Sequence, residues 1–94
     1  MTCTTPRVSI GVAVYNGERY LAQALDSLLA QTFEDFELTI CDNASTDRTG
    51  EIGRDYAAQD TRVRYVRNPR NLGVMGNFRR AFELSRGQYF RWAA

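Results

Sequence analysis

The fold is decided by a short apolar run, Val8-Ser9-Ile10-Gly11-Val12-Ala13-Val14. This run is rich in β-branched residues, which favours a buried strand. Tyr15-Asn16-Gly17 then breaks the run as a turn. From Glu18 the apolar period changes, because leucine and alanine recur at helical spacing as far as Leu29. The stretch therefore predicts a strand that leads through a turn into a helix.

The same order of strand and helix continues along the chain. Further strands are predicted at 36–41, 63–66 and 88–92. A polar turn from Asp42 to Asp47 separates the second strand from a second helix, to which it offers an N-cap. The apolar residues of that second helix form a weaker stripe: Ile52, Tyr56 and Ala57.

A third helix is predicted between the third and fourth strands. It is expected to end before Gly87, a residue type that favours the position after a helix. Its expected apolar face consists of Val74, Phe78, Ala81 and Phe82.

Strand and helix thus alternate three times before a final strand, which is typical of an α/β, Rossmann-like, doubly wound parallel sheet. Right-handed crossovers favour the strand order 3-2-1-4, with the first two helices on one face and the third on the other. Ligands in such sheets bind past the carboxyl ends of the strands where the winding reverses, here between strands 1 and 4. We expect residues 1–7 to be an N-terminal tail and residues 8–94 to form one unit.

Composition excludes several classes of function. The 94 residues carry a net charge of +1, too little to attract nucleic acid, so no nucleic-acid partner is expected. No histidine is present, which removes histidine catalysis and histidine metal ligation from this chain. No apolar stretch is long enough for a membrane span, and the first residues do not resemble a secretory signal. Cys3 and Cys41 lack a metal-ligand spacing and are expected to be free thiols, so we expect a cytoplasmic protein.

Asp42 is the first candidate for ligand contact, because it ends the second strand. An acid at that place accepts hydrogen bonds from a ribose hydroxyl or from the N3–H of uracil. Asp42 is therefore expected at the surface of a site, where its replacement leaves the fold intact. The alternative is that it only caps the next helix, although Ser45, Thr46 and Asp47 are also able to do so.

Two common nucleotide-binding motifs are absent. A dinucleotide-binding turn needs G-x-G-x-x-G after the first strand, but here Gly11 lies inside the strand and Gly17 lies beyond the turn. A phosphate-binding loop of the G-x-x-x-x-G-K-S/T type needs a lysine, and the sequence has none. Both of these readings are excluded.

Five segments in order resemble the family 2 glycosyltransferases of the GT-A fold. They are the opening strand and turn 8–17, Leu25 to Thr32, Phe36 to Asp47, Asn71-Leu72-Gly73 with Asn77, and Gly87 to Phe90. The resemblance covers roughly Val8 to Ala94, and it implies that the chain is the nucleotide-sugar-binding half of such a domain.

The resemblance implies a nucleotide site at the strand ends. In the family, the Tyr matching Tyr15 stacks beside the base and the Asp matching Asp42 accepts from it. An aromatic face and a fixed acceptor suit a planar base with an N–H donor. Glu18 is placed near the ribose, or else serves as the first residue of a helix, where its charge suits the dipole. The implied nucleotide-binding residues are Ala13, Val14, Tyr15, Glu18, Asp42, Asn43, Asn71 and Gly73.

Two of these assignments have plainer alternatives. Tyr15 is also compatible with an aromatic ring that only packs against the turn. Asn71 and Gly73 match a loop that borders the nucleotide or the sugar in the family, but Asn71 also suits the N-cap of the third helix. Arg70 is the candidate for contact with the phosphates.

The family's metal ligands are expected outside this chain. The strand matching 89–94 leads in the family into an Asp-x-Asp motif that binds Mg²⁺ or Mn²⁺, so the ligands are expected beyond Ala94. No catalytic residue and no metal ligand is therefore assigned within the 94 residues. The resemblance implies an inverting transfer of sugar from a UDP- or dTDP-sugar to an acceptor hydroxyl, with this chain inactive by itself.

Two other functions remain open from the sequence. A nucleotidyltransferase that activates sugars shares this sheet order, although its Gly-rich basic loop after the first strand is missing here. A non-catalytic, self-associating module is the other. The fourth strand is expected at an open sheet edge, where Phe90 and Trp92 add apolar surface, so a homo-oligomer is expected.

Overall fold

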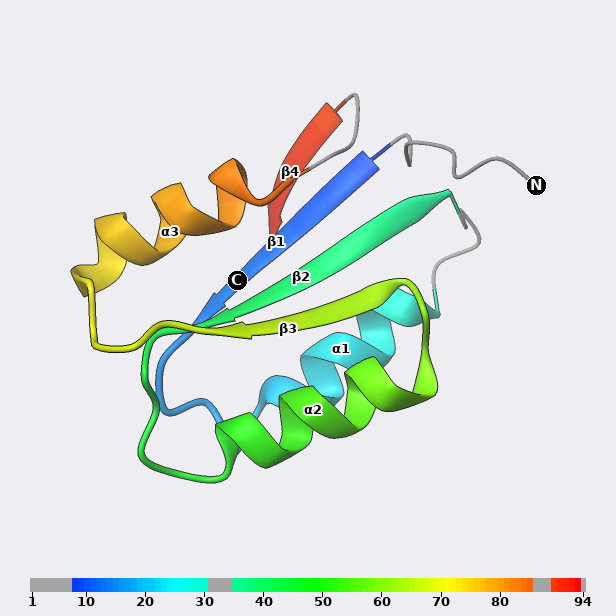
Figure 1. The fold of residues 1–94 in the computed structure, drawn as a ribbon. Coiled ribbons are helices and arrows are strands. Elements are labelled where there is room, and N and C mark those ends of the chain that lie inside the picture. Colours follow the sequence, from blue (N-terminus) through cyan, green and yellow to red (C-terminus); the bar gives the residue numbers. More distant parts are fainter. Residues whose placement is uncertain (1–7, 31–34, 86–88, 94) are drawn as a thin grey trace.

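The α/β class is confirmed. A computed structural model of the chain describes residues 8–30, 35–85 and 89–93. In chain order the elements are β1 (Val8–Val14), α1 (Leu21–Leu29), β2 (Phe36–Asp42), α2 (Thr49–Gln59), β3 (Val63–Arg67), α3 (Gly73–Glu83) and β4 (Tyr89–Ala93) (Figure 1). The expected tail, residues 1–7, lies outside this description.

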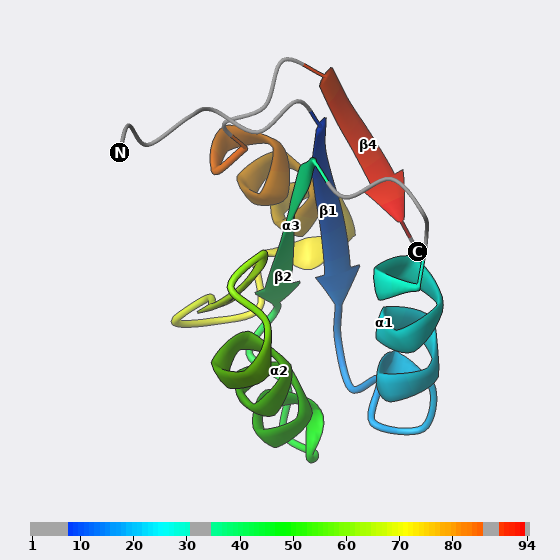
Figure 2. The same cartoon turned by 90° about the vertical axis from the view of Figure 1, so that its right-hand side faces the viewer.

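The four strands form one parallel sheet in the order β3-β2-β1-β4, which is the order that the sequence favours. Helices α1 and α2 cover one face, and α3 covers the other (Figure 2). The carboxyl ends of β1, β2 and β3 therefore meet at the edge of the sheet where α2 and α3 begin.

The apolar core lies on the face that α1 and α2 cover. Alternate residues of a strand point to opposite faces, and in β1 the residues that point to this face are Ile10, Val12 and Val14. The stripe of α2 packs against the same core, as the sequence predicts. The buried core residues are Ile10, Val12, Val14, Leu21, Leu25, Phe36, Leu38, Ile40 and Val63.

The face that α3 covers is more polar. Ser9 donates from its hydroxyl to Glu37 Oε2 over 2.6 Å, and both residues are buried. Arg64 reaches across the same face and donates to the carbonyl of Leu84 over 2.6 Å. Gly11 permits the approach of Phe90, because a Cβ at residue 11 would lie 2.8 Å from the Phe90 ring. This side of the sheet is held by hydrogen bonds and close backbone approach as well as by apolar packing.

Three details differ from the sequence-based expectations. The first helix begins at Leu21 and not at Glu18. On α3 only Ala81 of the expected apolar face is fully buried, whereas the side chains of Val74 and Phe82 are 70% and 56% exposed. Phe90 is half-buried, with its ring 5.2 Å from that of Phe82 in an edge-to-face contact, so it does not add the open apolar edge expected of it.

Two expectations lie outside the described residues. Gly87 is not described, and neither is the side chain of Trp92. Among the described residues, no helix combines the length and the apolar character that a bilayer crossing requires.

Candidate functional site

Three loops meet at the carboxyl ends of the strands. They follow β1 (residues 15–20), β2 (residues 43–48) and β3 (residues 68–72). The β1 loop and the β2 loop are joined across the edge, because the backbone N–H of Asn16 donates to Ser45 Oγ and the N–H of Thr46 donates to Asn16 Oδ1, each over 2.8 Å. Gly17 adds a third link by donating to Thr49 Oγ1 over 2.8 Å. These contacts give the turn after β1 one fixed position against the start of α2.

Glu18 belongs to this junction. Its Oε1 accepts from the backbone N–H of Arg48 over 2.8 Å, at the N-cap of α2. The carboxylate therefore serves the N-terminus of the second helix, where a negative charge is favourable, and not that of the first. It lines a shallow surface hollow with Arg19, Arg48 and Ile52, apart from the other predicted residues. Contact of Glu18 with a ribose stays a prediction.

Asp42 is buried, which corrects the expectation that it lies at the surface of the site. Its Oδ1 accepts from the backbone N–H of Ser45 over 2.9 Å. Its Oδ2 accepts from the Tyr65 hydroxyl and from Arg67 Nη1, the latter over 3.3 Å. Burial, and then the hydrogen bond to Asp42, raise the pKa of Tyr65, so that the phenol remains a donor. The carboxylate of Asp42 is thus bound by protein groups, and its bond to Ser45 helps to fix the loop after β2.

Asn43, the next residue, links the loop after β2 to the loop before α3. Its Nδ2 donates to Asn71 Oδ1 over 2.9 Å and to the carbonyl of Gly73 over 3.2 Å. Its Oδ1 accepts from the backbone N–H of Leu72 over 2.8 Å. Asn43 therefore fixes where α3 begins relative to the end of β2.

Asn71 and Gly73 form the turn into α3. Asn71 Oδ1 accepts from the backbone N–H of Gly73 over 2.7 Å. The N-cap position itself belongs to Leu72, so Asn71 acts one residue earlier than the alternative N-cap role predicts. Gly73 has a φ of +81°, a conformation that glycine adopts without strain.

A hollow of about 110 Å³ lies between the end of β1 and the start of α3. It brings together four of the predicted residues, namely Ala13, Val14, Tyr15 and Asn43. Tyr15 is 48% exposed, so the ring is available to a ligand. The hollow occupies the point where the direction of winding reverses, as expected for a doubly wound sheet.

Three residues of α3 complete this hollow and were not predicted as site residues. They are Val74, Asn77 and Phe78. The sequence held one signal for them, since the first turns of the helix after β3 start beside the switch point. The apolar spacing of Val74 and Phe78 instead favoured a role in the core, and Asn77 was noted only as part of the resemblance to the family.

A larger hollow, of about 500 Å³, lies on the outer surface of α3 and shares Phe78 with the first. Its lining is Met75, Gly76, Phe78, Arg79 and Phe82. It lies away from the strand ends, so we take the smaller hollow as the candidate site.

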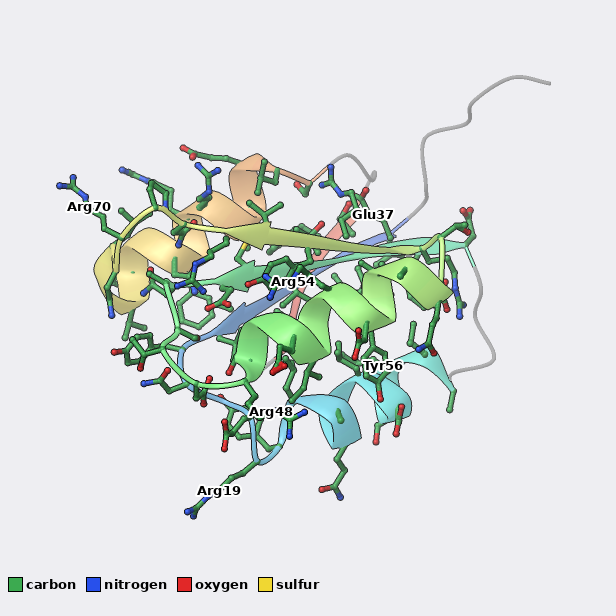
Figure 3. All side chains as sticks on the ribbon, turned by 60° about the horizontal axis from the view of Figure 1, so that its bottom comes forward. Arg19, Glu37, Arg48, Arg54, Tyr56 and Arg70 are labelled. Atoms are coloured by element: carbon green, nitrogen blue, oxygen red, sulfur yellow. The ribbon has the colours of Figure 1, made fainter. Side chains whose placement is uncertain are left out.

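None of the described residues that line the smaller hollow is charged. Figure 3 shows Arg70 extending outward from the loop before α3, and Glu37 at the opposite end of the sheet. Among the described residues, no group of three or more Asp, Glu, Cys or His side chains is placed to hold a metal ion. Burial raises the pKa of the Cys41 thiol to about 11, so this cysteine stays protonated near neutral pH.

Comparisons with known proteins point to one family. The model of glycosyl transferase family 2 matches residues 9–93. EpsE of Bacillus subtilis (strain 168) is 35% identical over 85 residues, which are 89% of this chain and 31% of EpsE.

Solved structures agree with this match. TarS 1-349 of S. aureus superposes with a TM-score of 0.84 and 27% identity, over 93% of this chain and 26% of the TarS 1-349 chain. A second TarS structure is a complex with UDP, with a TM-score of 0.78. The mannosyltransferase PcManGT from Pyrobaculum calidifontis, in complex with GDP-Man and Mn²⁺, has a TM-score of 0.75 and 25% identity, over 85% of this chain and 24% of PcManGT. The chain thus spans between 24% and 31% of EpsE, of the TarS 1-349 chain and of PcManGT.

Proposed function

Because the chain belongs to glycosyl transferase family 2, we propose that its protein transfers a sugar from a UDP- or dTDP-sugar to an acceptor hydroxyl with inversion. The observation that carries this proposal is the hollow between β1 and α3, with the Tyr15 ring exposed at its rim. Residues 8–94 supply the nucleotide-sugar-binding half of the GT-A domain. The chain spans less than a third of EpsE. We expect the catalytic residues to lie in the other half of the GT-A domain, so this chain alone should bind nucleotide without transferring sugar.

Each part of the hollow has a role in holding a nucleoside. The base stacks on Tyr15, whose ring offers a flat apolar face. Ala13 and Val14 form the floor of the hollow. Asn71 and Gly73 do not line it, but their loop adjoins it through Asn43 and Val74, so we propose that this loop borders the base. Asn43 and Asp42 hold these loops from behind, which is supported by their burial and their hydrogen bonds.

The described residues do not fit a divalent metal by themselves, since they place no cluster of acidic side chains. The PcManGT complex holds Mn²⁺, and we propose that Mg²⁺ or Mn²⁺ is held in this protein by residues other than those described. The buried, unpaired thiol of Cys41 suits a reducing compartment, and we propose the cytoplasm as its location.

Ligand-observed NMR of the chain with UDP, dTDP, GDP and NAD tests the proposal. We expect UDP or dTDP to bind, and Tyr15→Ala to weaken that binding by about 2- to 12-fold, the range that one aromatic stacking contact supplies. Loss of the ring removes stacking while the backbone of the turn keeps its links to Ser45 and Thr49.

Tyr20→Ala is the matched control. Tyr20 is also 48% exposed, but it does not line the hollow. Its replacement should leave nucleotide affinity unchanged. Equal losses from the two variants, or selective binding of NAD, would contradict the proposed site.

A further inference from the structure

Asn68, the first residue after β3, is completely buried and does not itself line the hollow. Its backbone N–H donates to the carbonyl of Asp42 over 2.8 Å, which ties it to the end of β2. Its side-chain Nδ2 donates twice, to Asn43 Oδ1 over 3.0 Å and to Asn77 Oδ1 over 2.9 Å. Both of these partners line the hollow, Asn43 from the loop after β2 and Asn77 from α3. Asn68 therefore links two parts of the lining of the hollow from behind.

The backbone fixes the direction of both partner amides. The N–H of Leu72 donates to Asn43 Oδ1 over 2.8 Å. Asn77 Nδ2 donates to the carbonyl of Cys41 over 3.0 Å. A backbone N–H can only donate and a carbonyl can only accept, so neither amide can be turned round without losing a bond. Each of the two amides therefore presents an oxygen to Asn68, whose side chain supplies the two N–H donors that meet them.

The oxygen of the Asn68 amide is in the opposite situation. Asn68 Oδ1 is buried, and among the described residues it has no hydrogen-bond partner. A buried amide oxygen without a partner lowers the stability of a fold. The two N–H donors of Asn68 therefore come with an acceptor that destabilises the chain, so stability alone does not account for an asparagine at this position. A role that needs both donors does account for it.

We propose that Asn68 is a positioning residue for the nucleotide site; this inference rests on the proposed function. By holding Asn43 and Asn77 at once, Asn68 sets the separation between the loop after β2 and helix α3. The same helix carries Val74 and Phe78, which complete the lining of the hollow. With α3 held in this way, the hollow has its binding shape before a nucleoside enters, so binding does not have to order the lining.

Removal of the two donors tests this role. Asn68→Leu keeps the branched outline of the side chain but leaves Asn43 and Asn77 unheld. One hydrogen bond between neutral groups shifts an equilibrium by about 2- to 12-fold, and the apparent affinity of a site falls with the fraction of molecules that have the binding shape. We expect UDP and dTDP to bind Asn68→Leu about 2- to 12-fold more weakly, both by the same factor, because Asn68 touches neither base. Protein-observed NMR with ¹⁵N labelling of the whole chain measures both affinities.

Val63→Ala is the control that separates positioning from a general loss of stability. Val63 is 4% exposed in the core and begins β3, at the other end of that strand from Asn68. Its truncation destabilises the chain but removes no bond of Asn68. At a temperature where both variants are fully folded, we expect Val63→Ala to bind UDP as the unaltered chain does. The signals of the Asn77 side-chain amide and of the Leu72 N–H should move in Asn68→Leu and stay in place in Val63→Ala.

The unaltered chain gives a second measurement that needs no variant. Because both of its donors are bound, the side-chain amide protons of Asn68 should exchange with water far more slowly than those of Gln23, which is exposed on α1. Saturating UDP should slow the Asn68 protons further, since binding and the intact bonds favour each other reciprocally. Exchange as fast as that of Gln23, or no effect of UDP on it, overturns the role of Asn68.

The outcomes separate this inference from the proposed function. Unchanged affinity for UDP in Asn68→Leu, or an equal loss in Val63→Ala, overturns the role of Asn68 and leaves the nucleotide site standing. A changed ratio of UDP to dTDP affinity would indicate direct contact with the base, and it also overturns a positioning role. If Asn68→Leu does not fold, the exchange measurement decides. Failure of both nucleotides to bind the folded, unaltered chain overturns this inference and the proposed function together.

Discussion

Asp42 shows how a single side chain at a strand end serves the fold. Replacement by asparagine keeps its shape but removes the charge that Arg67 and the Tyr65 hydroxyl meet. We expect Asp42→Asn to lower the free energy of unfolding by about 1.5–3 kcal/mol, the value of a buried hydrogen bond to a charged group. Urea denaturation followed by circular dichroism measures this change.

Asp55→Asn is the control for that experiment, because Asp55 is exposed on α2. It should change the midpoint little. If Asp42→Asn instead kept full stability and lost nucleotide binding, Asp42 would be a ligand-contacting residue after all.

The position of Asp42 was predictable from the sequence, but its burial was not. An acid after an apolar run marks the end of a strand in a doubly wound sheet. Its partners Tyr65 and Arg67 lie on β3, more than twenty residues later. Nothing in the local pattern around Asp42 reports which side chains the neighbouring strand will bring to it.

At the scale of elements, α2 packs against β3 through a glycine. A Cβ at Gly53 would clash with Tyr65 Cδ1 and would lie 2.8 Å from Tyr65 Cε1, and Tyr65 is held in place by its hydrogen bond to Asp42. Alanine favours a helix by about 1 kcal/mol over glycine, but overpacking costs about 1–3 kcal/mol. We therefore expect Gly53→Ala to destabilise the chain, as measured by thermal unfolding.

Gly50 offers the matched substitution on the same helix. There a Cβ would lie 3.1 Å from the Tyr65 hydroxyl and 3.2 Å from the Arg54 guanidinium, whose long side chain can move aside. Gly50→Ala should cost clearly less than Gly53→Ala. Equal effects would show that helix propensity, and not the Tyr65 ring, decides the outcome.

The order and type of the elements were predictable from the change between the strand period and the helix period of the apolar residues. The start of α1 was not. Glu18 is at the right place to begin α1, yet its carboxylate is bound at Arg48, thirty residues away. The predicted apolar face of α3 was also partly wrong. Val74 and Phe82 have helical spacing, but the residues of α3 that the structure buries are Asn77 and Ala81.

For the whole molecule, these exposed side chains predict self-association. Met75 is 79% exposed and Val74 is 70% exposed on α3, and β4 ends the sheet with one side unpaired by the described strands. Exposed apolar patches and open strand edges associate with other copies of a chain. We expect oligomers in light scattering at high concentration, and a shift toward monomer in Met75→Glu.

Gln23 lies on α1, which covers the opposite face of the sheet from α3 (Figure 2). Gln23→Glu adds the same charge there and should leave the oligomers intact. A clean monomer of the original chain at high concentration would refute the prediction. The sequence predicted self-association through the β4 edge, because Phe90 was expected to be exposed there. The contact between Phe90 and Phe82 could not be predicted from the sequence.

The distribution of the core along the chain bears on how the protein is made. Every fully buried residue of the apolar cluster lies between Ile10 and Val63. All of these residues are synthesised before Gly73, the first residue of α3. The part of the chain up to β3 therefore contains this apolar core by itself, before α3 covers the other face of the sheet and β4 pairs with β1.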